Sequence, residues 1–228
     1  QRQRELKLPV VKVILSSATF DPSVLKPFKH IKKHYTLPVQ FATKYKVNEH
    51  YLDACTRGSG CSVCSLFRLN HHPVEVISQT VKLLKGTERL LCFVPSVEAV
   101  NQTLDALLKE KNVRAVPLHA QQDGKMQQKY LETERIFIST NIAETSLTFP
   151  NLRFVIDMGL VQRPRTTTQG ALMETVLASV STLKQRRGRV GRTCDGDYIG
   201  LFLKADKRPD HIEPKIALDP LEDFQFNL

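Results

Sequence analysis

Short apolar runs alternate along this chain with segments whose apolar residues recur every three or four positions. The periodic segments predict amphipathic helices, which begin near Pro73 and Pro95 and span Gln121–Leu131 and Ser181–Val190. The short runs predict buried strands, at Val11–Leu15, Arg89–Val94, Val113–Leu118, Arg135–Ser139, Leu152–Asp157 and Tyr198–Leu203. This alternation is typical of the doubly wound α/β class, a mostly parallel sheet with helices on both faces.

Three stretches depart from the alternation. Residues 35–52 are extended in character, and residues 172–177 are extended or mixed. Residues 55–72 are small, polar and rich in Cys and His without any periodicity, which predicts a loop or insertion. The tail at 205–228 is charged and interrupted by prolines, and we interpret it as an exit segment.

Composition narrows the class of protein. The 228 residues are 41% hydrophobic, which is close to the globular norm and argues against disorder. The apolar runs are too short to span a bilayer, and no long apolar segment follows Gln1, so we expect no membrane partner and no signal peptide. The five cysteines do not make a disulfide scaffold, and we expect an intracellular protein, nuclear or cytoplasmic. The net charge of +10 indicates an anionic partner only weakly.

The strongest chemical signal is the segment from Gln185 to Arg192. It holds one glutamine, four arginines and two glycines in eight residues. Gln185, Arg189 and Arg192 are spaced to project from one side of a helix. Planar, fixed donors of this kind suit a polyphosphate. A solvated basic helix is the alternative, although it does not require glycine at two set positions.

A second signal follows the predicted strand that ends at Ser139. The segment Ile138–Thr148 is rich in hydroxyl groups and lies at the carboxyl end of a strand, where open α/β sheets bind ligands. Such groups suit a sugar-phosphate backbone, although an ordinary capped turn has the same composition. The tripeptide Ser17-Ala18-Thr19 also follows a strand and is weak by itself.

In this order the motifs resemble those of superfamily 2 helicases, in the DEAH/RNA-helicase-A branch. Ser17–Thr19 is similar to motif III, Leu91–Ser96 to motif IV, Ser139–Thr148 to motif V and Gln185–Arg192 to motif VI. The resemblance implies a RecA-like fold and covers most of the chain. Residues 1–36 then correspond to the end of a first RecA-like domain and residues 37–204 to the second.

The resemblance implies specific roles at the nucleotide. Gln185, Arg189 and Arg192 match residues that reach the ATP phosphates as arginine fingers. Arg186 of the same motif and Thr148, at the ribose position, are candidate nucleotide-binding residues. The chain has neither a GxxxxGK[ST] motif nor a DEAH motif. We therefore expect ATP and Mg²⁺ to be held largely by a first RecA-like domain of the same chain, and this segment alone to be inactive.

The resemblance also implies RNA as partner and translocation in the 3′ to 5′ direction. The residues that match RNA contacts are Ser96, Thr140 and Asn141, and His119 is a further candidate. Ser17 and Thr19 match the link that couples the ATP and RNA sites.

Two positions depart from the family pattern. Pro150 stands where DEAH enzymes commonly have an aspartate, and Tyr130-Leu131 where the family often stacks an aromatic ring on adenine. Both changes favour loose selectivity among nucleoside triphosphates.

The insertion carries Cys55, Cys61, Cys64 and His71. The Cys61-x-x-Cys64 pair has zinc-ligand spacing, but the second ligand pair lacks regular spacing, and we favour reduced cysteines.

Three alternatives to an active helicase stay open: an inactive helicase-like scaffold that binds RNA or protein, a viral superfamily 2 helicase domain, and a small zinc-bearing nucleic-acid module.

Overall fold

The computed structural model describes residues 44–55, 61–67, 72–144, 147–167 and 170–211. The strand and helix expected between Val11 and Phe28 lie outside these residues, as do Ser17, Thr19 and His71. Within the described part of the chain, no helix is both long and apolar enough to cross a bilayer.

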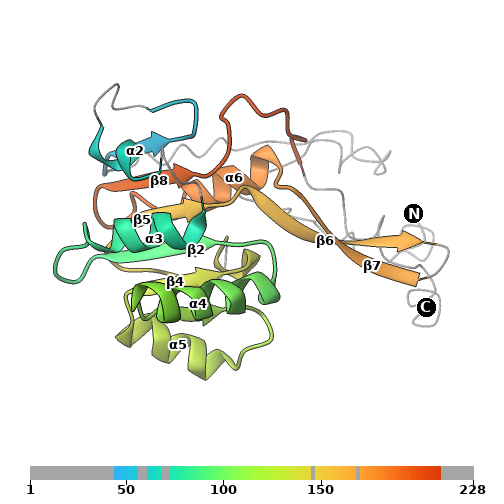
Figure 1. The fold of residues 1–228 in the computed structure, drawn as a ribbon, viewed down its shortest axis with the longest axis horizontal. Coiled ribbons are helices and arrows are strands. Elements are labelled where there is room, and N and C mark those ends of the chain that lie inside the picture. Colours follow the sequence, from blue (N-terminus) through green and yellow to red (C-terminus); the bar gives the residue numbers. More distant parts are fainter. Residues whose placement is uncertain (1–43, 56–60, 68–71, 145–146, 168–169, 212–228) are drawn as a thin grey trace, which may run out of the picture. The chain divides into compact units, whose positions relative to one another are not determined.

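A six-stranded parallel sheet forms the centre of the fold (Figure 1). Its strand order is β1-β8-β5-β2-β4-β3. The strands are β1 (Val47–His50), β2 (Arg89–Phe93), β3 (Val116–Leu118), β4 (Ile136–Ser139), β5 (Leu152–Asp157) and β8 (Gly196–Gly200). The strand order is that of a doubly wound sheet, which confirms the predicted fold class.

Alternate residues of each strand face opposite layers of helices. Leu90 and Cys92 of β2 pack in one apolar cluster, while Leu91 and Phe93 pack in the other. Helices α2 (Ser62–Phe67), α3 (Pro73–Val81) and α4 (Val97–Lys111) cover the first face. Helices α5 (Gly124–Thr133) and α6 (Val180–Arg187), with the short 3-10 helix η2 (Asn141–Glu144), lie on the second. We call these the α3–α4 face and the α6 face.

Local sequence explains the helix boundaries. Ser96, Asp123 and Ser179 each accept a backbone N–H in the first turn of the helix that follows, at 3.0, 3.2 and 3.2 Å, the expected role of N-cap residues. Helix α4 ends at Asn112, whose φ of 50° is left-handed, a conformation that asparagine tolerates.

Four predicted elements need correction. Helix α6 ends at Arg187, before the expected Val190, so Arg189 and Arg192 lie beyond its last turn. The segment expected as a loop contains helix α2, which is too short to show a period. Helix α3 ends at Val81, before the expected Lys85. The extended segment at 172–177 belongs to β7 (Gly170–Leu177), whose antiparallel partner β6 (Leu160–Thr167) was not predicted, because Pro164 and two arginines interrupt its apolar pattern.

The first described residues of the exit segment fold back onto the domain. The backbone N–H groups of Val180 and Ser181 donate to the carbonyls of Pro209 and Asp210 at 2.9 and 3.0 Å. Arg208 Nη1 donates to the Gly159 carbonyl at 2.6 Å. This segment therefore satisfies N–H groups at the start of α6, which no helical carbonyl can reach.

Candidate functional site

Arg186 lies at the centre of a buried network beside the carboxyl ends of the strands. Its side chain is fully buried and pairs with Glu144 (Nε–Oε1, 2.9 Å) and Asp157 (Nη1–Oδ1, 2.7 Å). The guanidinium lies over the Phe93 ring, 4.9 Å from its centroid. Tyr198 Oη donates to the other Asp157 oxygen at 2.7 Å. The network joins η2, α6, β2, β5 and β8, so Arg186 holds the layers together from inside the fold.

Burial and ion pairing together set the pKa values of Glu144 and Arg186. Burial raises the pKa of Glu144 in spite of the neighbouring Arg186. The pKa of Arg186 is raised although burial opposes its charge, because Asp157 and Glu144 both stabilise it. Sequence reasoning missed Asp157 and Glu144. The signal for Asp157 was a carboxylate at the end of an otherwise apolar strand.

Arg189 holds the segment that follows η2. Its Nη1 donates to the Leu147 carbonyl at 2.8 Å, and its Nη2 donates to the Glu144 carbonyl. Its Nε is buried without a hydrogen-bond partner among the described residues. Burial and the nearby charge of Arg192 lower the pKa of Arg189 to about 10. Arg189 is thus a buried cation that binds neutral oxygens.

Arg192 is exposed, and its Nε donates to the Gly188 carbonyl at 2.7 Å. Within the described part of the chain, neither Arg189 nor Arg192 forms an ion pair with a carboxylate. Arg187 is exposed and pairs with Glu49 of β1 (Nη1–Oε1, 2.6 Å). Gln185 is half-buried in the last turn of α6. The motif therefore contains two buried arginines, Arg186 and Arg189, and two exposed ones, Arg187 and Arg192.

Gly191 of this motif has a structural reason to be glycine. Its φ is +78°, and a Cβ there would lie 2.3 Å from Val47 Cγ2. A side chain would therefore be strained and would collide with β1. Gly188 has an ordinary helical conformation.

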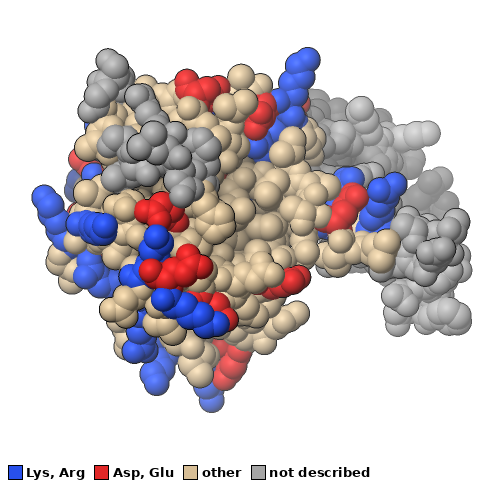
Figure 2. All heavy atoms as spheres, in the orientation of Figure 1, with Lys and Arg blue, Asp and Glu red and all other residues tan. Residues whose placement is uncertain are grey.

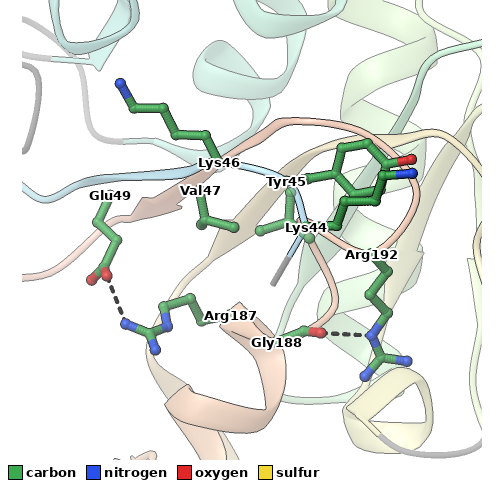
Figure 3. Close-up of a pocket in the computed structure, with 9 residues that line it drawn as sticks. Lys44, Tyr45, Lys46, Val47, Glu49, Arg187, Gly188 and Arg192 are labelled. Carbon is green, nitrogen blue, oxygen red and sulfur yellow. Dashed lines mark hydrogen bonds and ion pairs between the residues drawn. The ribbon is translucent and has the colours of Figure 1, made fainter. Parts of the chain in front are cut away.

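A basic pocket adjoins the end of the motif (Figure 3). Arg192 and Gly188 line one side, and the residues that lead into β1 line the other. Its volume is about 880 Å³, and it is lined by Lys44, Tyr45, Lys46, Val47, Glu49, Arg187, Gly188, Val190 and Arg192. Its one carboxylate already pairs with Arg187. The positive charge of the pocket is therefore mostly uncompensated. Nothing in the sequence pattern pointed to residues 44–46.

The predicted RNA-contact residues follow neighbouring strands at one edge of the sheet. Ser96 lies just beyond β2, His119 directly follows β3, and Thr140 and Asn141 follow β4. Asn141 is exposed, whereas Thr140 is buried and its N–H donates to the Leu118 carbonyl at 3.1 Å. The His119 Nδ1 is buried without a partner among the described residues. The structure thus brings these candidates to a common edge of the sheet.

The candidate nucleotide-binding residues outside motif VI do not lie together. Thr148 is exposed and follows Leu147, which Arg189 binds. Leu131 lies elsewhere, because its carbonyl accepts from Arg89 Nη1 at the amino end of β2. Tyr130, its neighbour in α5, packs against the core. The Leu131 carbonyl thus lies near the amino end of β2, and the role of Leu131 at the nucleotide stays a prediction.

Charge does not gather into one patch on the α3–α4 side. Figure 2 shows acidic and basic side chains interspersed there. The net charge of +10 therefore does not identify a binding surface on this side.

The fold is a parallel sheet between two helical layers, with an arginine-rich segment at the end of α6. These features define a RecA-like helicase domain. Residues 73–194 match the family described as Helicase conserved C-terminal domain. The chain belongs to this family, since the match covers more than half of its length.

Curated relatives belong to the DEAH branch of helicases. The ATP-dependent RNA helicase HrpA of Escherichia coli is 28% identical over 217 residues, which cover 91% of this chain and 16% of HrpA. The ATP-dependent RNA helicase DHX30 of Gallus gallus is 34% identical over 149 residues, 59% of this chain and 12% of DHX30. The chain therefore spans a small part of the relatives it matches.

Solved structures agree on the fold. The Escherichia coli DEAH/RHA helicase HrpB superposes with a TM-score of 0.67 and 23% identity, over 90% of this chain and 26% of HrpB. At this identity the likeness shows the fold alone.

Proposed function

We propose that this chain is the second motor domain of an ATP-dependent RNA helicase of DEAH type. Gln185, Arg189 and Arg192 act on the phosphates of a bound nucleoside triphosphate. The observation that carries this proposal is the pair Arg189 and Arg192, which lack a carboxylate partner in the described chain and lie close enough for Arg192 to lower the pKa of Arg189. An anion that binds between two such cations relieves their repulsion.

The remaining parts of an ATP site come from a first RecA-like domain of the same protein. The chain contains neither a phosphate-binding GxxxxGK[ST] loop nor an acidic DEAH motif. In this proposal the first domain holds ATP and Mg²⁺, and closure brings Arg189 and Arg192 to the transferring phosphate. Thr148, next to the segment bound by Arg189, faces the ribose. Mg²⁺ would neutralise charge on the phosphates when bound.

RNA binds along the carboxyl edge of the sheet in this proposal. Asn141 is the exposed contact, and Ser96 and His119 flank it on neighbouring strands. Thr140 contributes through its position, because its side chain is buried. Amide and hydroxyl groups at strand ends suit a sugar-phosphate backbone. Alternate closure and opening then move the domain along one strand from 3′ to 5′.

The nucleotide role is tested in the full-length protein by comparing Arg192→Ala with Arg187→Ala. Both arginines are exposed, so both variants should keep the melting temperature of the wild type. We expect Arg192→Ala to lower RNA-stimulated ATP turnover by about 10³-fold or more, the effect of losing an arginine finger, and Arg187→Ala to change it little. Turnover that survives in Arg192→Ala would contradict the proposal.

The RNA role is tested by comparing Asn141→Ala with Asn112→Gly. Asn112 lies at the far end of α4 in a left-handed conformation that glycine adopts readily. We expect weaker binding of single-stranded RNA only for Asn141→Ala. RNA binding by a wild-type protein that hydrolyses no nucleotide would instead support the inactive scaffold.

A further inference from the structure

Three cysteines and a histidine converge on the α3–α4 face, away from the arginines of α6. The ligand atoms of His50, Cys55, Cys61 and Cys64 all lie within 4.8 Å of one another. His50 Nδ1 lies 3.3 Å from Cys55 Sγ, 3.4 Å from Cys64 Sγ and 3.7 Å from Cys61 Sγ. We propose that these four residues bind a zinc ion in a structural Cys₃His site.

The distances fit a tetrahedral ion. Zinc bonds of about 2.3 Å to sulfur and about 2.05 Å to nitrogen, at tetrahedral angles, place each nitrogen–sulfur pair about 3.6 Å apart. The three measured separations bracket that value. Hydrogen bonding alone does not explain them, because one ring nitrogen has a single lone pair or a single proton to share. One central cation satisfies all four atoms at once.

The orientation of His50 prepares its Nδ1 for a metal. Its Nε2 lies 2.7 Å from Asp197 Oδ1, and both side chains are fully buried. A carboxylate accepts the Nε2 proton, which leaves the lone pair of the neutral ring on Nδ1, toward the sulfurs. Arg153 Nη1 in turn holds Asp197 Oδ2 at 2.6 Å. Carboxylate support of this kind orients zinc-binding histidines.

The backbone brings the ligands together from two directions. Cys61 directly precedes α2 and Cys64 lies in its first turn, so the Cys-x-x-Cys spacing sets both sulfurs on one side. The chain turns back after β1, so that His50 and Cys55 form an isolated antiparallel bridge. His50 of β1 supplies the nitrogen ligand that the sequence had suggested for His71, which lies outside the described residues.

The proposed zinc site is closed to solvent on the side of Cys61 and Cys64. Cys61 and Cys64 are 9% and 2% exposed, and they belong to the same apolar cluster as Val63, Val74 and Ile77. Four protein ligands with no open position are typical of structural zinc, and thiolate with imidazole selects zinc over magnesium or calcium. The ion would fasten Cys55 and α2 to β1.

The test measures metal in the full-length protein purified without added zinc. We expect one zinc ion per chain by plasma mass spectrometry, and its loss in Cys61→Ser and Cys64→Ser. Cys194→Ser is the matched control, since Cys194 lies outside the cluster and its Sγ contacts the Leu152 carbonyl. A wild-type protein without stoichiometric zinc, or with a disulfide among these cysteines, would overturn the proposal.

Two further measurements guard against a variant that simply fails to fold. Wild-type protein loaded with Co²⁺ should show the intense visible absorption of a tetrahedral thiolate site, and weak octahedral absorption would overturn the proposal. Asp197→Asn should keep the ion but weaken zinc affinity in chelator competition by about 10- to 100-fold. Unchanged affinity would contradict the positioning role of Asp197. These readouts do not depend on helicase activity, so they can fail or succeed independently of the proposed function.

Discussion

Arg186 and Glu144 are separated by 42 residues in the chain, yet Arg186 Nε donates to Glu144 Oε1 at 2.9 Å inside the protein. This ion pair connects the arginine-rich segment to the segment that follows β4. It therefore couples the part of the domain proposed to meet the nucleotide to the part proposed to meet RNA.

Arg186 and Arg187 are adjacent and chemically identical, but they should differ strongly in their effect on stability. Arg186→Ala leaves two buried carboxylates without their cation and should lower the free energy of unfolding by about 3–5 kcal/mol. Arg187→Ala removes only an exposed ion pair with Glu49 and should cost about 1 kcal/mol or less. Chemical denaturation measures both, and equal losses would contradict the buried network.

The contribution of Glu144 to stability should depend on pH. Because burial raises its pKa above the ordinary 4.5, the folded protein keeps the proton at pH values where the unfolded chain has lost it. The contribution of Glu144 therefore falls as the pH rises from 4.5 through the raised pKa. It falls by about 1.4 kcal/mol for each pKa unit of the shift.

Glu144→Gln removes this titration, so the stability of wild type minus that of the variant should decrease over the same pH range in denaturant titrations. Glu75 supplies a control of opposite sign, because its hydrogen bonds with Lys111 and Gln79 lower its pKa. The corresponding difference for Glu75→Gln should decrease as the pH falls below 4.5. A flat difference for Glu144 would show that burial does not govern its charge.

Gly191→Ala should destabilise the domain through contact with β1. The positive φ and the overlap with Val47 together predict a loss of about 2–4 kcal/mol. Adding Val47→Ala should recover part of it, because the colliding methyl is then gone. Gly124→Ala, at the start of α5, is the control. A Cβ added there would meet no atom within 4 Å, so this variant should be neutral or slightly stabilising. Thermal denaturation of the three variants and the wild type tests this order.

Leu131→Ala should not change nucleotide selectivity. The Leu131 carbonyl lies at the amino end of β2, where it accepts from Arg89 Nη1, whereas open α/β sheets bind ligands at the carboxyl ends of their strands. We therefore expect the relative kcat/KM values for ATP, GTP, CTP and UTP in the full-length protein to match those of the wild type. A tenfold shift in preference would instead support the contact with adenine that the resemblance implies at Tyr130-Leu131.

Signals local to the sequence predicted most of the sheet, because the apolar runs of its strands are encoded in a few consecutive residues. The different roles of the arginines in motif VI could not be predicted, because the residues are of the same type. Nothing local distinguishes Arg186 from Arg187, since the difference lies in their partners Glu144 of η2 and Asp157 of β5, which are distant in sequence.

The metal cluster shows the same limit. The zinc spacing of Cys61 and Cys64 was visible in the sequence, but the histidine was sought after the cysteines and lies before them. His50 reaches the cluster only because β1 pairs with β8, which also brings Asp197 to its ring.

The backbone bridge between His50 and Cys55 has a consequence for the behaviour of the protein in concentrated solution. Among the described strands, β1 is the last on its side of the sheet, and an edge strand with unpaired amide and carbonyl groups can pair with strands of other molecules. At His50 the chain itself occupies that edge. The bridge at Cys55 therefore protects this part of β1 from pairing with other molecules, and loss of the proposed zinc ion would be expected to expose it to self-association.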